Sequence, residues 1–179
     1  TTEVENTTYY RLFIPGHVPT YSPGKPELPV MSGLIYIPEG ADYKIIISNI
    51  KTTRLHPSTK KIKGILYPAQ ESDSKRPEER KRDFKIDREA YGSRTLLPFD
   101  TVKIEAIGNL RGKNLYNIII APVRYNPRTN SLEVITSMKI EITNIASSGS
   151  KSEATVSETP LFSLPLEKSV MNYTAGDVI

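Results

Sequence analysis

The feature that most constrains this fold is the way in which its apolar runs are interrupted. Runs rich in Ile, Val, Leu and Tyr recur along the chain, separated by clusters of proline, glycine and asparagine. Proline lacks a backbone donor, and glycine and asparagine favour tight turns, so these clusters break helices and connect strands. The expected strands are Tyr9–Ile14, Val30–Ile37, Tyr43–Ile50, Ile62–Tyr67, Thr101–Ile107, Leu115–Tyr125 and Ser131–Ile142. Short strands spaced by such turns predict an all-β fold, an antiparallel, jelly-roll-like β-sandwich with a short C-terminal helix.

Four segments carry further detail. Thr101–Ile107 alternates apolar and charged residues, as a half-buried strand does. Leu115–Tyr125 contains Pro122, which predicts a bulge or a kink. Tyr21–Pro29 is rich in proline and therefore predicts extended chain at a sheet edge. Phe84–Tyr91 fits either a strand or a turn of helix.

The chain of 179 residues is expected to form one domain, or one domain with a tail. Residues 1–145 would form the β-sandwich, and the Ser-, Thr- and Gly-rich residues 146–160 a flexible linker. Residues 161–179 would hold a docking helix and a tail. The helix is expected over Pro165–Tyr173, with Ser163 as its N-cap.

The segment Ala69–Phe84, AQESDSKRPEERKRDF, differs from the rest of the chain because it has no apolar residue between its ends except Pro77. It cannot form core, so we expect a long loop that faces solvent. Long loops without structure of their own are uncommon in compact domains and are usually functional or disordered. Its basic run Lys75–Arg82 could equally be a plain solvated stretch of charge.

Composition disfavours several function classes. The chain has no cysteine, which removes thiol nucleophiles, thiolate metal ligands and disulfides. His17 and His56 lie beside turn residues and far apart, as surface histidines do, so neither a metal site nor a cofactor is expected. No phosphate loop and no pairing of a histidine with a nucleophile is present. We therefore expect a chain that is not an enzyme.

Two kinds of partner are also disfavoured. The net charge is +4, but the basic run holds no aromatic residue of the kind that single-stranded nucleic acid stacks on, so no nucleic-acid partner is expected. No apolar run approaches the roughly 18 residues of a membrane-spanning helix, so no membrane insertion is expected. The chain begins at Thr1 rather than at methionine, which suggests a processed or trimmed form.

Several motifs, taken in order, resemble one family. They are Ile14-Pro15-Gly16, Pro23-Gly24-Lys25-Pro26-Glu27-Leu28-Pro29, Ile35-Tyr36-Ile37-Pro38 with Gly40-Ala41, Leu110-Arg111-Gly112, Pro122-Val123-Arg124-Tyr125-Asn126-Pro127 with Asn130-Ser131-Leu132, Met138-Lys139-Ile140-Glu141-Ile142, and Lys168-Ser169-Val170-Met171-Asn172-Tyr173. Each motif alone is turn chemistry around a strand, whereas their joint order is more specific. Over roughly Val4 to Tyr173, the chain resembles the N-terminal prodomain of the gingipain family of secreted cysteine proteases.

The resemblance implies a β-sandwich that covers the active-site face of a cognate cysteine protease catalytic domain, as its inhibitor and folding chaperone. It also implies export through the periplasm, by type IX secretion, to the surface of a Bacteroidetes-type bacterium or beyond. In the family, a prodomain loop places a basic side chain in the primary specificity (S1) pocket. That loop corresponds here to Ser74, Lys75, Arg76 and Pro77, with Lys75 as the inserted side chain. A one-residue shift in alignment would select Arg76 and indicate the arginine-specific branch.

Elementary physical chemistry supports such a plug. A protease that cuts after a basic residue needs a carboxylate in its pocket, and a basic side chain that enters forms a charge-assisted hydrogen bond there. Pro77 restricts Arg76 to extended conformations, and extended chain is what a protease cleft binds. An exposed basic loop would also be a site for proteolytic nicking, and both properties can hold together.

Two departures from the family keep other functions open. The family has additional strand sequence before the position of Thr1, and it is released by cleavage after a basic residue soon past the equivalent of Tyr173. Thr174–Ile179 contains no basic residue. One alternative is therefore the permanent N-terminal β domain of a related type IX secretion sortase. Another is an adhesion or carbohydrate-binding β-sandwich, whose aromatic platform would use the tyrosines Tyr9, Tyr10, Tyr36, Tyr43 and Tyr116.

Overall fold

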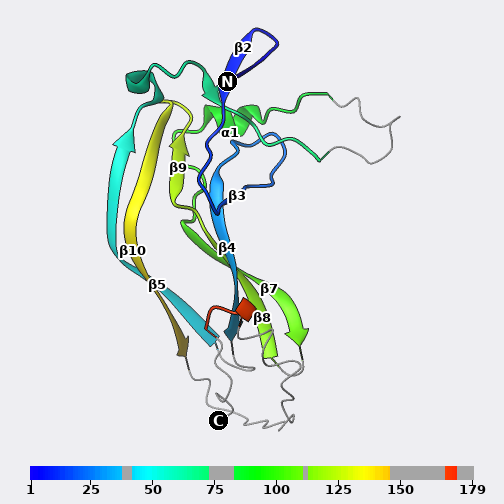
Figure 1. Ribbon diagram of the computed structural model, residues 1–179, viewed down its shortest axis with the longest axis vertical. Helices are drawn as coiled ribbons and strands as arrows, with labels where there is room; N and C mark the ends of the chain where they lie inside the picture. The colour runs from blue at the N-terminus through cyan, green and yellow to red at the C-terminus, as the bar shows by residue number, and fades with distance from the viewer. Residues whose placement is uncertain (38–41, 73–82, 111–112, 146–167, 173–179) are drawn as a thin grey trace. The chain divides into compact units, whose positions relative to one another are not determined.

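The computed structural model describes residues 1–37, 42–72, 83–110, 113–145 and 168–172, and almost all of their regular structure is β-strand (Figure 1). The described chain forms two compact units. Unit 1 comprises Thr1–Met31, Lys51–Thr101 and Ala121–Thr136, and unit 2 comprises Ser32–Ile50, Val102–Ile120 and Ser137–Ile179. The predicted all-β class is confirmed.

The strands are arranged in three sheets. The four-stranded sheet has the order β3 (Val18–Pro19), β4 (Pro29–Ile37), β8 (Lys113–Ile120) and β7 (Val102–Leu110). A three-stranded sheet has the order β5 (Asp42–Leu55), β10 (Ser131–Ile145) and β9 (Val123–Asn126). The third sheet has the order β1 (Thr2–Val4), β2 (Thr7–Tyr10) and β6 (Ile65–Leu66). The short helices are η1 (Pro57–Lys60) and α1 (Arg88–Gly92).

Unit 2 contains two layers of strand that pack face to face. Buried side chains of β4, β7 and β8 form its centre, and partly buried side chains of β5 and β10 pack against them. The buried members are Ile35, Ile37, Val102 and Ile118, and those packed on from β5 and β10 are Tyr43, Ile45, Ile47, Met138, Ile140 and Ile142. This is the sandwich arrangement that the alternating sequence predicts, because alternate residues of each strand point into one core.

The last described residues of unit 2 lie along the edge of β4. Val170 is buried and forms a parallel bridge with Leu34, whose carbonyl accepts a hydrogen bond from the Met171 amide at 2.9 Å. Asn172 receives a hydrogen bond from the Tyr36 amide (2.7 Å) and returns one from its side-chain nitrogen to the Tyr36 carbonyl (2.8 Å). The side-chain amide of Asn172 therefore substitutes for a strand partner.

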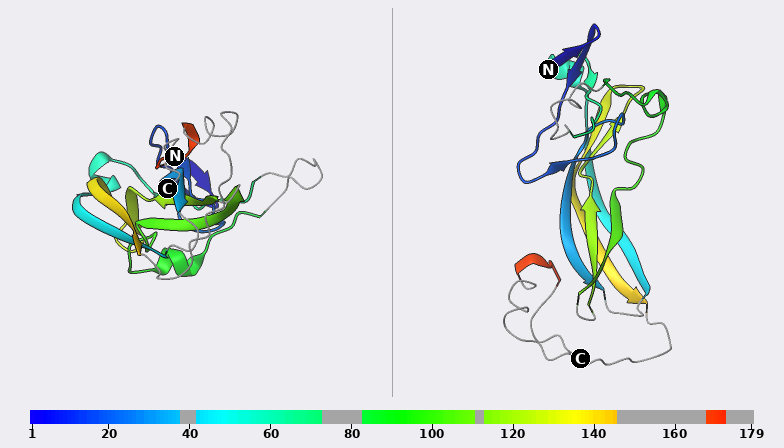
Figure 2. Two further views of the ribbon diagram at one scale, coloured as in Figure 1. Left: turned by 90° about the horizontal axis from the view of Figure 1, so that it is seen from below. Right: turned by 90° about the vertical axis from the view of Figure 1, so that its right-hand side faces the viewer.

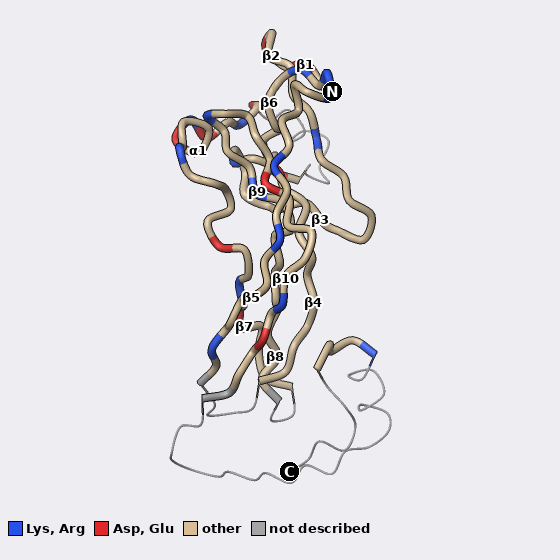
Figure 3. Tube along the Cα trace, turned by 90° about the vertical axis from the view of Figure 1, so that its left-hand side faces the viewer, with Lys and Arg blue, Asp and Glu red and all other residues tan. Residues whose placement is uncertain are grey.

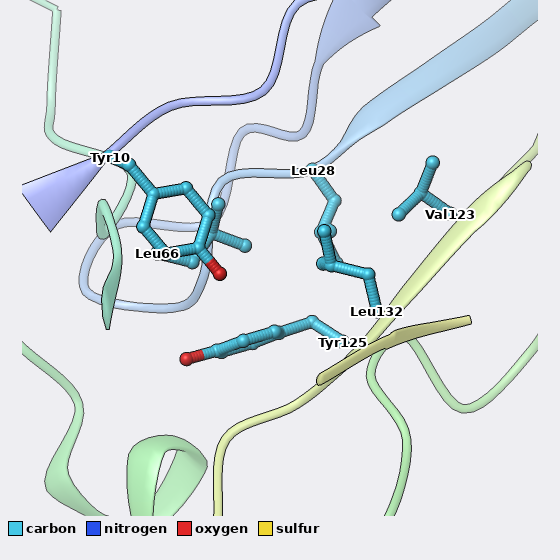
Figure 4. Packing of buried hydrophobic residues seen from close by; sticks show 6 residues of the cluster. All are labelled: Tyr10, Leu28, Leu66, Val123, Tyr125 and Leu132. Atoms are coloured by element: carbon cyan, nitrogen blue, oxygen red, sulfur yellow. The ribbon is translucent and has the colours of Figure 1, made fainter. Parts of the chain in front are cut away.

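The core of unit 1 is built around two buried tyrosines, Tyr10 and Tyr125, which pack with leucine and valine (Figure 4). Both phenol hydroxyls donate to the side-chain oxygen of Asn130, at 3.0 and 2.9 Å, while its nitrogen donates to the Gly64 carbonyl at 2.9 Å. A Cβ atom at Gly64 would lie 2.1 Å from the Thr8 carbonyl oxygen, so only glycine fits there.

Several predicted segments differ in extent from the strands observed. The strand expected over Tyr9–Ile14 is Thr7–Tyr10, and the one expected over Ile62–Tyr67 is Ile65–Leu66. The run Leu115–Tyr125 divides at Pro122 into β8 and β9, in agreement with the predicted interruption.

The ambiguous segment Phe84–Tyr91 ends in α1 rather than in a strand. Of the expected helix Pro165–Tyr173, the described part is helical only at Lys168 and Ser169 and then becomes the bridge at Val170, so it is shorter than predicted. The bounds expected for the linker, 146–160, lie outside the described residues.

Charged residues of both signs are interspersed along the described chain (Figure 3). On β7 and β10, lysine and glutamate two residues apart form exposed ion pairs, Lys103–Glu105 and Lys139–Glu141, both at 2.6 Å. Such exposed pairs contribute little to stability and mainly keep a strand face soluble.

Candidate functional site

The predicted inhibitory residues Ser74, Lys75, Arg76 and Pro77 lie outside the described residues. The structure does describe both ends of the segment that carries them. We call residues 67–71 the entry stem and residues 84–87 the exit stem. Both belong to unit 1. Their contacts determine how the intervening chain is attached.

The two stems are joined by one glutamine side chain. The Lys85 amide donates to the side-chain oxygen of Gln70 at 2.9 Å, and the Gln70 side-chain nitrogen donates to the Lys85 carbonyl at 2.8 Å. Gln70 also donates to the Pro68 carbonyl in its own stem, and Lys85 forms an ion pair with Glu71. Gln70 thus replaces one rung of a β-ladder, and the stems are held at a fixed separation.

We call the paired hydrogen bonds of Gln70 and Lys85 the glutamine clamp. An aromatic cluster of Tyr9, Tyr67 and Phe84 includes one residue from each stem. The Phe84 ring is 5.3 Å from Tyr9 and 5.7 Å from Tyr67, and the two tyrosine rings are 5.8 Å apart, measured between ring centroids. The Arg11 guanidinium lies 4.0 Å from the centre of the Tyr67 ring and 3.6 Å from the Glu27 carboxylate. Aromatic pairs and cation–π contacts of this kind add to the stabilisation from buried area.

A third segment lies between the stems and hydrogen-bonds to both. The Gly24 amide donates to the Ala69 carbonyl at 2.7 Å, and the Gly24 carbonyl accepts from the Asp87 amide at 2.9 Å. The Ala69 amide donates to the Lys25 carbonyl at 2.8 Å. Gly24 has φ of +86°, and a Cβ there would lie 3.0 Å from the Asp87 nitrogen, so glycine is required for the chain to fit between the stems.

The exit stem continues directly into α1. Asp87 caps this helix, because its carboxylate accepts a hydrogen bond from the Ala90 amide at 2.9 Å. In the helix, the Tyr91 hydroxyl donates to the Leu66 carbonyl at 2.6 Å, just before the entry stem. Burial raises the pKa of the Tyr91 phenol well above its usual range. The phenol therefore remains neutral and continues to donate at neutral pH.

Comparison with known proteins places this arrangement in one family. The family described as Propeptide_C25 matches residues 2–174, which is nearly the whole chain. The chain belongs to this family. The resemblance to gingipain prodomains is thereby confirmed, and the chain is a non-catalytic propeptide of the gingipain type.

Relatives and solved structures agree with this placement. Lys-gingipain from Porphyromonas gingivalis is 29% identical over 140 residues, covering 78% of this chain and 8% of the relative. The chain thus spans a small part of the relatives it matches. A structure of gingipain K from the same organism, described for its zymogenic latency, has a TM-score of 0.70 at 27% identity, with 82% of this chain and 80% of that chain covered.

A complex of the pro- and mature domains of RgpB from Porphyromonas gingivalis has the same fold. Its TM-score is 0.68 at 20% identity, with 89% of this chain and 78% of that chain covered.

In this gingipain-type propeptide, the sequence identified the segment between the stems but missed the residues that hold it. From the sequence, Phe84 is only the end of the charged run and the start of the ambiguous segment Phe84–Tyr91, and Gln70 has no predicted role. Tyr9 was considered as part of an exposed aromatic platform, yet it is buried. The available signal was the return of aromatic residues at Tyr67 and Phe84 on the two sides of a polar stretch.

Three features of the described residues bear on the other functions that the sequence left open. The five tyrosines proposed for a carbohydrate platform, Tyr9, Tyr10, Tyr36, Tyr43 and Tyr116, are all buried or half-buried. Within the described ranges, no group of three or more His, Asp or Glu side chains could hold a metal ion. In the same ranges, no helix combines the length and the apolar character needed to cross a membrane.

A cavity of about 470 Å³ in unit 1 is lined by ten residues, three of them arginines. One of these, Arg124, already interacts with other groups of the chain. Its guanidinium donates to the Pro98 carbonyl at 3.3 Å and contacts the Glu133 carboxylate at 3.4 Å.

Proposed function

We propose that this chain keeps a cognate gingipain-type cysteine protease inactive by placing the Lys75 side chain in the primary specificity pocket of the enzyme. The observation that carries the proposal is the double hydrogen bond between Gln70 and Lys85, which closes the base of the segment. A loop with fixed ends has less conformational freedom to lose on binding than a free chain of equal length.

The chemistry of the tip supports the same assignment. A carboxylate at the base of a specificity pocket is costly to bury unless a cation pairs with it, so the inserted side chain should dominate affinity. Lys75 is the residue assigned to that role and Arg76 is its rival. Ser74 and Pro77 flank them, and Pro77 keeps the preceding residue extended, as a cleft requires.

The proposal includes a second role during folding. A propeptide that binds the active-site face of a catalytic domain also stabilises the folded form of that domain, by mass action. We further propose export through the periplasm by type IX secretion, followed by action at the cell surface or outside the cell. Membership of the propeptide family supports both the folding role and the export route.

The experiment is an inhibition assay of the isolated chain against lysine-specific and arginine-specific gingipain-type proteases. We expect strong inhibition of one enzyme, lost in Lys75→Ala and kept in Arg76→Ala. Arg80→Ala is the matched control, since it removes one charge from the same basic run without touching the proposed tip. Retention of inhibition in Lys75→Ala with loss in Arg76→Ala would transfer the role to the neighbour.

Absence of inhibition of either enzyme would contradict the proposal and favour a permanent N-terminal domain. The folding role needs a separate measurement, the yield of active catalytic domain refolded with and without this chain. Equal yields would contradict the chaperone part alone.

A further inference from the structure

Two large side chains of unit 1 project into solvent from the segment between β2 and β4. Phe13 is 84% exposed and Tyr21 is 66% exposed. This segment leaves the rest of the unit as a loop, drawn in dark blue in the right-hand view of Figure 2. Single exposed apolar residues are common on protein surfaces, so their position decides whether they have a function.

Phe13 lies on the same exposed side of the chain as Arg11, which contacts Tyr67 of the entry stem. Leu12 and Ile14 both pack against the core of unit 1, while Arg11 and Phe13 are exposed. With burial alternating in this way, Arg11 and Phe13 point away from the core, roughly 7 Å apart along an extended chain. The Arg11 guanidinium lies over the Tyr67 ring of the entry stem, and Phe13 follows two residues later on the same exposed face of the chain.

Tyr21 is held near the stems by the residues that follow it. Three residues later, Gly24 hydrogen-bonds to Ala69 of the entry stem and to Asp87 of the exit stem. Immediately before Tyr21, the Thr20 amide donates to the Leu28 carbonyl at 2.8 Å, and the Thr20 hydroxyl accepts from the Leu28 amide at 3.0 Å. The backbone on each side of Tyr21 is therefore fixed.

We propose that Phe13 and Tyr21 form an apolar docking surface, which flanks the inhibitory loop and packs on the rim of the substrate cleft of the cognate catalytic domain. This inference rests on the proposed function. The position of this surface identifies its partner, because a catalytic domain that binds the tip of the loop also approaches the surface beside the stems. The solved complex of the RgpB pro- and mature domains shows that a chain with this fold assembles with a mature domain.

The chemistry of the two side chains suits such a surface. Aromatic side chains are enriched at the centres of protein interfaces, because they bury a large area at a low cost in side-chain entropy. The Tyr21 hydroxyl adds one hydrogen-bonding group at the edge. An apolar contact of this kind differs from the charged tip in one measurable respect: the affinity that it contributes is insensitive to salt.

The test measures the dissociation constant of the full chain for the inactivated catalytic domain, with Phe13→Ala, Tyr21→Ala and the double variant. Both substituted side chains are exposed to solvent, so folding is expected to persist in all three variants, which circular dichroism and melting temperature would verify. We expect the double variant to bind roughly 10- to 100-fold more weakly, mostly through faster dissociation and equally at low and high salt. Phe99→Ala is the matched control, since Phe99 is 78% exposed and neighbours Arg124 rather than the stems.

Several outcomes would overturn the inference. One is a double variant that binds as well as Phe99→Ala, while Lys75→Ala still abolishes inhibition. This result would refute the docking surface and leave the proposed function intact. Another is concentration-dependent self-association of the wild-type chain that disappears in the double variant, which would assign the surface to a second copy. Absence of any binding by the wild-type chain would instead contradict the proposed function itself.

Discussion

Gln70 and Lys85, fifteen residues apart in the sequence, exchange two hydrogen bonds between the side chain of one and the backbone of the other. This clamp joins the stems of the charged segment where no strand pairing does so. A net contribution of about 1 kcal/mol per hydrogen bond is modest for the whole domain. It is large, however, relative to the free energy of locally opening a loop.

The clamp predicts that Gln70→Ala makes the charged segment more susceptible to proteolysis. Loss of both cross-stem hydrogen bonds frees the ends of the segment, and a lysine-specific protease should cut within residues 69–84 roughly tenfold faster. The measurement is the half-life of the intact chain by mass spectrometry, at fixed protease concentration. Ser72→Ala, an exposed change in the same segment, serves as the control. Equal half-lives for the two variants would show that the aromatic cluster, the Gly24 hydrogen bonds and the Lys85–Glu71 ion pair hold the stems without the clamp.

Asn130 is predicted to be the most sensitive polar residue of unit 1. Its side chain accepts from both buried phenols and donates to the Gly64 carbonyl, and its backbone has φ of +46°. Asn130→Ala removes these three hydrogen bonds and adds backbone strain, at a cost of about 3–5 kcal/mol in the free energy of unfolding. Asn130→Gly removes the same hydrogen bonds without the strain and should cost about 1 kcal/mol less. Chemical denaturation of both variants measures this difference, and an Asn130→Ala variant of wild-type stability would refute the assignment.

How well the sequence predicts each part of this fold depends on how far apart in the sequence the interacting residues lie. The strands follow from alternation along the chain, so β4, β7 and β10 lie where expected, and Pro122 interrupts β8 and β9 because it cannot donate to a ladder. The clamp between Gln70 and Lys85 could not be predicted, because its two ends become neighbours only after the stems and Gly24 have been brought together. The early end of β2 at Tyr10 could not be predicted either. Leu12 and Ile14 continue its apolar pattern but pack on the core without a strand partner.

The buried phenols predict a stability that falls in alkaline solution. Burial raises the pKa of Tyr10, Tyr91 and Tyr125 above the ordinary value of 10.0. Their folded-state pKa is therefore higher than their unfolded-state pKa, so their contribution is complete below pH 10.0 and is lost as the pH rises above it. Three such groups give a maximum slope of about 4 kcal/mol per pH unit. Melting temperature followed from about pH 8 to about pH 11 should stay flat and then fall.

Tyr91→Phe provides the control for this pH dependence. The variant loses the hydrogen bond to Leu66 and should be less stable at neutral pH, yet its stability should fall less steeply above pH 10.0 because one titrating group is gone. Parallel curves for wild type and Tyr91→Phe would contradict the assignment of the alkaline transition to buried phenols.

The side chain of Asn172 is predicted to protect the edge of β4 in unit 2. Its two hydrogen bonds to Tyr36 and the Met171–Leu34 bond are the polar contacts that attach the segment 168–172 to this strand. Asn172→Ala should accelerate hydrogen exchange at the Tyr36 amide roughly tenfold, since this amide loses its acceptor. Asn172→Asp keeps an acceptor for the amide but places a carboxylate oxygen against the Tyr36 carbonyl, so its protection should be intermediate. Lys168→Ala, exposed and outside these contacts, should exchange as wild type. Equal exchange at Tyr36 in all three variants would mean that the buried Val170 and the Met171–Leu34 hydrogen bond hold the segment without the Asn172 side chain.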